Sequence, residues 1–182
     1  MKIFVIIVSV LFQAYMHEDM SVWKAHIDTI VDLPYEYGYC GYIVAEAKKD
    51  GKEALMPEAK RYVQQFKAHT EELRTQLPAG HYEMYRSAVY VYELRLKESI
   101  HPIKAMTLAK EATELAPDDP VVNSYYGTCL FYAPKPFGSK AEALRWFEKA
   151  QKGFSGEEWK ESWIREANEM YIRKCLKYIN KK

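Results

Sequence analysis

The side chains that could carry acid–base or metal chemistry are spread along this sequence. Its five histidines are His17, His26, His69, His81 and His101. His69 and Glu72 lie three residues apart on one predicted helix, a spacing that could form one edge of a metal site. No second His–carboxylate pair follows them, so a solvated helix face is the simpler interpretation. The histidines therefore predict no metal centre.

The adjacent carboxylates of Asp118 and Asp119 could serve as an acid–base pair. They stand in an Ala-Pro-Asp-Asp-Pro turn, where Asp119 can cap a helix that Pro120 begins. The sequence contains no G-x-S-x-G, H-E-x-x-H, Walker or dinucleotide-binding glycine motif. We therefore expect no catalytic residue, no metal and no cofactor, and a protein that is not an enzyme.

Composition and charge limit the kinds of partner. The 182 residues include 26 basic and 25 acidic ones, for a net charge of +1. No run of like charge is long enough to follow a nucleic-acid backbone, so no nucleic-acid partner is expected. The 15 tyrosines provide large, rigid contact area with a polar tip. The cysteines, Cys40, Cys129 and Cys175, are far apart and odd in number, which favours buried small residues over a disulfide framework.

The first 20 residues differ from the rest. Lys2 precedes an apolar run of ten residues, Ile3 to Phe12, which only Ser9 interrupts. A membrane-spanning helix needs roughly 20 residues, so we expect no membrane span. The run is typical of a signal peptide, followed here by a short polar start, and it predicts an exported protein, periplasmic or secreted. Cleavage after Ala14 would place bulky Phe12 where a small residue is preferred, so a packed segment of a cytoplasmic protein is the alternative.

Beyond this segment, apolar residues recur at three- and four-residue steps, and Pro, Gly and Asp mark the breaks. No convincing stretch alternates with a period of two, so the predicted fold class is all-α, built of antiparallel helical hairpins. We expect one domain over residues 21–178 and a frayed basic tail over 179–182. The predicted helices cover residues 21–32, 34–48, 57–76, 82–96, 103–115, 121–132, 140–153 and 158–178.

Some of these helices carry boundary signals. In the first, Ser21 is a candidate N-cap, and Ser139 can cap the helix over residues 140–153 in the same way. The apolar face of the first helix is formed by Trp23, Ile27, Ile30 and Val31. The last helix, over residues 158–178, has polar residues opposite its apolar side, as a helix that caps a repeat array must have.

The second half of the chain repeats itself with a period of 38–39 residues. The matching pairs are Pro78 and Pro117, Ala88 and Gly127, Ala105 and Ala143, and Ala112 and Ala150. Such self-similarity is typical of stacked helical hairpins, none of which can bury its apolar face alone. It therefore favours an interaction scaffold over a catalyst.

The residue types at these positions resemble the tetratricopeptide repeat, which has a small residue midway along the first helix and an Ala-rich second helix. The resemblance is best over residues 78–154, weak before them, and extends to Gly41 as the small residue of a degenerate first unit. The Phe137–Lys140 connection is similar to that of divergent exported bacterial members, while Met84 and Asn123 replace the family's large aromatic. The residues that match are Gly127, Leu130, Ala143, Phe147 and Ala150, and before them Ala88, Ala105, Ala109, Ala112 and Pro117.

The resemblance implies a right-handed α-solenoid whose concave face binds a peptide or protein segment. Aromatic residues with an Arg are common in contact hot spots. For each tyrosine, a place in the core between hairpins is the alternative. The candidate binding residues are Tyr35, Tyr42, Tyr82, Tyr85, Arg86, Tyr92, Tyr125, Thr128 and Tyr132.

Two other functions compete with the scaffold. The first is an all-helical enzyme or small-ligand domain, in which His69, His81 or His101 meet carboxylates in space. The second is an assembly subunit, a possible dimer, that uses Trp159 and Trp163 of the C-terminal helix as its contact.

Overall fold

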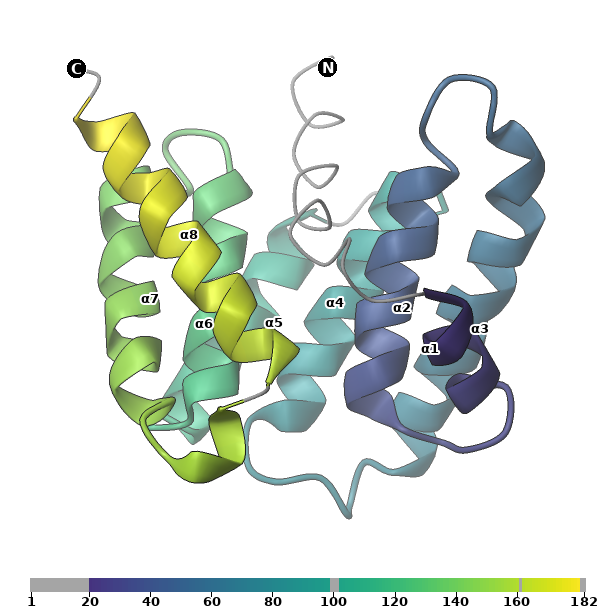
Figure 1. Ribbon diagram of the computed structural model, residues 1–182, viewed down its shortest axis with the longest axis horizontal. Helices are drawn as coiled ribbons and strands as arrows, with labels where there is room; N and C mark the ends of the chain where they lie inside the picture. The colour runs from purple at the N-terminus through teal and green to yellow at the C-terminus, as the bar shows by residue number, and fades with distance from the viewer. Residues whose placement is uncertain (1–19, 99–101, 161, 181–182) are drawn as a thin grey trace. The chain divides into compact units, whose positions relative to one another are not determined.

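The computed structural model describes residues 20–98, 102–160 and 162–180 and is all-helical over these ranges (Figure 1). The all-α prediction is therefore confirmed. Two short 3-10 segments, η1 (Glu53–Leu55) and η2 (Glu157–Trp159), accompany the α-helices. The α-helices are α1 (Met20–Ile27), α2 (Leu33–Glu46), α3 (Met56–Glu72), α4 (His81–Arg95), α5 (Pro102–Leu115), α6 (Pro120–Tyr132), α7 (Lys140–Gly153) and α8 (Trp163–Ile179).

The chain divides into two compact units. Unit 1 comprises Met1–Pro78 and Tyr85–Thr107, and unit 2 comprises Ala79–Met84 and Leu108–Lys182. Helices α1, α2 and α3 belong to unit 1, and α6, α7 and α8 belong to unit 2, while α4 and α5 each contribute residues to both.

In unit 1, α1 is shorter than the helix predicted over residues 21–32. It begins at Met20, so Ser21 lies inside it, and it ends at Ile27. Asp32 must be extended because it caps α2: its carboxylate accepts a hydrogen bond from the Tyr35 N–H. A helix cannot continue into that residue. Ile30 and Val31 consequently lie in the connection, 56% and 48% exposed, and the prediction that they share one helix face with Trp23 is wrong.

The core of unit 1 forms where α2 packs against α1 and α3. Trp23 of α1 lies against Gly38, where a β-carbon would come within 2.3 Å of its ring. The aromatic rings of Tyr39 and Tyr62 meet edge to face with centroids 4.8 Å apart. Helix α3 begins with Pro57 in its first turn, as predicted, and ends at Glu72, four residues before the predicted end at Gln76.

In unit 2, α6 and α7 form a hairpin whose two N-caps are those predicted from the sequence. The Asp119 carboxylate accepts from the Val122 N–H at 2.9 Å, and the Ser139 hydroxyl accepts from the Glu142 N–H at 3.1 Å. The helices cross at Gly127, where a β-carbon would lie 2.9 Å from the ring of Phe147. The small residue at this position therefore allows the close crossing.

Helix α8 packs mainly on α7 and also contacts α6. Its Tyr171 ring stacks on Phe147, with centroids 5.1 Å apart. The predicted single helix over residues 158–178 is instead η2 followed by α8, because Ser162 is extended and starts a new helix. Trp159 lies in η2 and packs edge to face on buried Phe154, so much of its ring is used within unit 2.

Among the described residues, no helix combines the length and apolarity needed to cross a lipid bilayer. This agrees with the absence of a membrane span expected from the sequence. The apolar run Ile3–Phe12 and the signal-peptide prediction lie outside the described residues.

Candidate functional site

The predicted binding residues Tyr35 and Tyr42 lie on one side of α2 in unit 1 and are half-buried. The Tyr35 ring is 5.1 Å from Trp23 and 4.6 Å from the His26 ring, centroid to centroid. The Tyr42 ring lies 5.9 Å from Tyr39. Each ring therefore rests on its neighbours and keeps part of its surface open.

Tyr85 and Tyr92, from the α4 part of unit 1, are buried. The Tyr85 ring meets Phe66 of α3 edge to face with centroids 5.6 Å apart. The Tyr92 hydroxyl donates to the Tyr37 carbonyl oxygen at 2.8 Å, which satisfies its polar tip inside the core. Both rings pack within unit 1 in this conformation, and partner contact through them stays a prediction.

Arg86 lies on the more open side of α4 and forms an ion pair of 2.6 Å with Glu71 of α3. Its guanidinium also donates to the Tyr90 hydroxyl at 3.4 Å. Lys104 of α5 lies 4.9 Å from the centroid of the same ring. The interaction with Lys104, followed by that with Arg86, lowers the pKa of Tyr90 against the effect of burial. We call Arg86, Tyr90 and Lys104 the cationic-aromatic cluster.

The sequence prediction included only Arg86 of this cluster. Tyr90 stands four residues after Arg86 on the same predicted helix, a spacing that was available as a signal. Lys104 comes from the next helix, and its approach to Tyr90 is a tertiary contact that the sequence pattern does not indicate.

In unit 2, the predicted residues Tyr82, Thr128 and Tyr132 are half-buried and Tyr125 is buried. The Thr128 hydroxyl donates to the Ser124 carbonyl oxygen one turn earlier, at 3.1 Å. The Tyr132 hydroxyl is 3.1 Å from the Tyr171 hydroxyl. The Tyr132 side chain thus supports the packing of α6 on α8 and remains half-buried, so part of its surface stays accessible.

Lys140, which is not among the predicted binding residues, lies among aromatic rings in unit 2. Its ammonium is 3.8 Å from the Phe131 ring centroid, and it donates to the Phe131 carbonyl oxygen. Tyr132 and Tyr178 lie 5.9 and 5.8 Å from it. Burial lowers the pKa of Lys140. The arrangement anchors the start of α7 against the end of α6 by cation–π attraction.

The nine predicted binding residues thus fall into two groups. Unit 1 holds Tyr35, Tyr42, Tyr85, Arg86 and Tyr92, and unit 2 holds Tyr82, Tyr125, Thr128 and Tyr132. Six of the nine retain an open edge, and Tyr85, Tyr92 and Tyr125 are buried.

Each described histidine meets a carboxylate. His26 Nε2 lies 3.0 Å from Asp32 Oδ2, and His69 Nδ1 lies 2.8 Å from Glu36 Oε1, both in unit 1. His81 Nε2 lies 3.0 Å from Asp119 Oδ2 in unit 2. His17 and His101 lie outside the described residues.

Glu36 is the most buried of these carboxylates, with 1% of its surface exposed. One oxygen binds His69, and the other, Oε2, has no hydrogen-bond partner among the residues that the structure describes. Burial raises the pKa of Glu36, and the hydrogen bond from His69 only partly opposes this. Asp119 shows the opposite balance: burial is outweighed by hydrogen bonds from His81 and the Val122 N–H, so its pKa is lowered.

No group of three or more His, Cys, Asp or Glu side chains within the described ranges could hold a metal ion. Glu72, the proposed second ligand beside His69, is exposed, whereas His69 turns to Glu36. Cys40 and Cys175 are buried, and burial raises the pKa of each thiol. Neither thiol is therefore a ready nucleophile.

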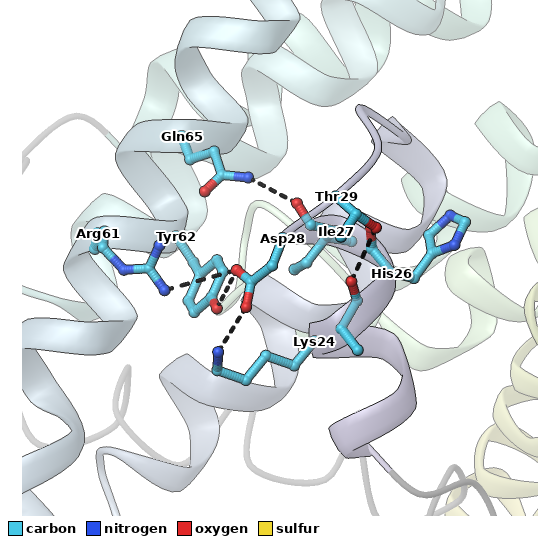
Figure 2. Close-up of polar contacts among 9 residues, drawn as sticks. Lys24, His26, Ile27, Asp28, Thr29, Arg61, Tyr62 and Gln65 are labelled. Carbon is cyan, nitrogen blue, oxygen red and sulfur yellow. Dashed lines mark hydrogen bonds and ion pairs between the residues drawn. The ribbon is translucent and has the colours of Figure 1, made fainter.

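A polar network joins α1 to α3 in unit 1 (Figure 2). The Asp28 carboxylate accepts from Lys24 and from the Tyr62 hydroxyl, each at 2.7 Å. Arg61 stacks over the Tyr62 ring at 4.0 Å. Gln65 donates to the Ile27 carbonyl oxygen at 3.2 Å and so satisfies the end of α1. The network fixes a short helix in place.

Comparisons with protein-family models, with curated proteins and with solved structures find no match to this chain. The functional assignment therefore rests on the residues and contacts described above.

Proposed function

We propose that this protein is a divergent tetratricopeptide-like α-solenoid that binds a peptide or protein segment and performs no catalysis. The observation that carries the proposal is the α6–α7 crossing. Gly127 faces Phe147 there, and the Phe147, Ala143 and Ala150 side chains are fully buried. A small residue facing a large one, flanked by alanines one turn away on either side, is what that repeat requires.

The preceding hairpin supports the same register. In unit 1, the Ser87 hydroxyl donates to the Ala105 carbonyl oxygen at 2.7 Å, so α4 and α5 lie close beside Ala88. In unit 2, a β-carbon at Gly80 would come within 2.6 Å of the Ala112 carbonyl oxygen. The two alanines whose carbonyl oxygens form these close approaches, Ala105 and Ala112, stand one period before Ala143 and Ala150 of α7.

In this proposal, the partner-binding face of each unit consists of the predicted residues in that unit that keep an open edge. They combine large aromatic rings with one cation, and the cationic-aromatic cluster adds Tyr90 and Lys104. Such a surface suits a segment with aromatic and acidic residues, because guanidinium groups pair with carboxylates and stack on rings. These residues are Tyr35, Tyr42 and Arg86 in unit 1, and Tyr82, Thr128 and Tyr132 in unit 2.

Site-specific photocrosslinking in the source organism tests this face. We expect p-benzoylphenylalanine in place of Tyr42, Tyr82 or Tyr132 to form the same defined adduct, because one aromatic ring replaces another at a contact. Adding Arg86→Gln is expected to lower the adduct yield about tenfold, as loss of a contact hot spot would. Lys60→Gln removes a comparable ion pair, with Glu98, and should leave the yield unchanged.

The photoreactive residue at exposed positions Ala68 and Arg145 provides the background. Equal adducts from these positions and from the three tyrosine positions would rule out the assigned face. Defined adducts that Arg86→Gln does not weaken would move the contact away from the cationic-aromatic cluster.

We also propose export, on the basis of Lys2 and the apolar run that follows it. Mass spectrometry of protein purified from its native host should then detect a mature N-terminus within the first 20 residues after removal of that run. Recovery of the chain with Met1 still attached would show that the segment is retained and would favour the cytoplasmic alternative.

A further inference from the structure

The last two turns of α8 carry a surface that neither the helix packing nor the proposed binding face uses. Ile172, Leu176 and Ile179 follow one another at four- and three-residue steps and so form one stripe. Leu176 is 42% exposed and Ile179 36% exposed, while Tyr171 and Cys175 on the neighbouring side are buried. The stripe therefore lies beside the packed face of α8, with Ile172 half-buried and Leu176 and Ile179 exposed to solvent.

The same segment is strongly basic. From Met170 to Lys182 the sequence has five basic residues and no acidic one: Arg173, Lys174, Lys177, Lys181 and Lys182. Arg173 and Lys177 are exposed and one turn apart, and within the described part of the chain neither forms an ion pair. Positive charge is favourable at a helix C-terminus, but that effect does not account for the exposed apolar stripe.

We propose that the C-terminal two turns of α8 dock on an anionic lipid surface. Ile172, Leu176 and Ile179 enter the interfacial layer, and Arg173 and Lys177 lie among the headgroups. Charge complementarity selects this occupant, because an apolar stripe flanked by cations is the pattern of a helix that lies on acidic lipid. A second copy of this chain docked on the same stripe would instead bring the exposed cations Arg173 and Lys177 of both copies together.

Vesicle flotation of the full-length protein tests the proposal. One vesicle contains phosphatidylcholine alone, and the other contains phosphatidylcholine with phosphatidylglycerol. We expect binding to the anionic vesicle that weakens as salt increases. Arg173→Gln/Lys177→Gln should lower the partition coefficient roughly thirtyfold, because each cation near such a surface contributes about a factor of five. Leu176→Ser/Ile179→Ser should also lower the partition coefficient, although this variant has the same net charge as the unmodified protein.

Matched control variants on the same unit distinguish binding at this site from non-specific electrostatic or hydrophobic binding. Arg145→Gln/Lys152→Gln makes the same charge change on exposed positions of α7. Leu115→Ser/Phe137→Ser removes two apolar side chains that are 51% and 60% exposed elsewhere. Both control variants should bind like the unmodified protein, and circular dichroism should show that all four are folded.

The apolar run near the N-terminus is present in every variant, so any insertion through it adds equally to all measurements. Equal binding to both vesicles, or equal loss in the α8 variants and their controls, would overturn the proposal. So would a dimer, detected by light scattering, that only Leu176→Ser/Ile179→Ser disperses.

Discussion

Replacing Gly127 with leucine is expected to destabilise unit 2 by about 3 kcal/mol. A β-carbon at this position would lie 2.9 Å from the Phe147 ring, well inside van der Waals contact. That ring cannot move aside, because it is fully buried and stacks on Tyr171 at 5.1 Å. The added side chain must therefore separate α6 from α7 or be forced into a strained rotamer.

The measurement is urea unfolding followed by circular dichroism at the helix band. Ala141→Leu, at an exposed position of α7, is the matched control and should change the free energy of unfolding little. The loss of unfolding free energy for Gly127→Ala should lie between those for Gly127→Leu and Ala141→Leu. Its smaller clash with the Phe147 ring is offset by a gain in helix propensity of about 1 kcal/mol.

A double-mutant cycle identifies the cause. Phe147→Ala alone opens a cavity and costs about 3–5 kcal/mol. If the Gly127→Leu effect comes from the clash with this ring, the two substitutions together should cost less than the sum of the single effects. Additive costs, or an unchanged stability for Gly127→Leu, would contradict the close crossing and weaken the repeat register on which the proposed function rests.

Local sequence chemistry predicted the helix starts that depend on it. Asp119 and Ser139 cap their helices because a short side chain with an oxygen, just before a helical segment, can accept a hydrogen bond from a free backbone N–H of the first turn. The C-terminal end of α1, by contrast, was predicted incorrectly. Ile30 and Val31 continue its apolar period, but the need for an extended Asp32 at the start of α2 outweighs that pattern.

The candidate site was predicted less completely, because it depends on contacts between helices. The sequence places Tyr85, Tyr90 and Tyr92 on one helix without showing which of its sides meets α3. In the structure Tyr85 and Tyr92 face the core, and Tyr90 lies beside Lys104. Glu36 was missed for the same reason, since the side chain that hydrogen-bonds to it, His69, stands 33 residues away.

Removing the partner of Glu36 should produce the second large effect. His69→Ala is expected to destabilise unit 1 by about 3 kcal/mol at pH 7.5, because it leaves a buried carboxylate without its hydrogen-bond donor. Glu36→Gln/His69→Ala should recover most of that loss, since a neutral amide is less costly to bury than an unpaired carboxylate. His26→Ala breaks the more exposed pair with Asp32 and is the matched control, with a cost below about 1 kcal/mol.

The pH dependence has a definite sign. Burial raises the pKa of Glu36 in the folded protein, so folding favours the protonated carboxyl. The contribution of the Glu36 carboxyl to the free energy of unfolding is fully present below the ordinary glutamate pKa. It is lost as pH rises through the folded-state pKa. His69→Ala removes the hydrogen bond that lowers this pKa, so its cost should be small at pH 4.5 and should grow towards pH 7.5.

The pH dependence is measured by thermal unfolding at pH 4.5 and pH 7.5. The four proteins compared are the unmodified protein, His69→Ala, Glu36→Gln and Glu36→Gln/His69→Ala. The cost of His69→Ala should depend on pH when Glu36 is present and lose that dependence in the Glu36→Gln background. A cost that is the same at both pH values would mean that His69 acts by packing alone. A pH dependence that persists with Gln at position 36 would assign the titration to another group and refute the role given to this buried pair.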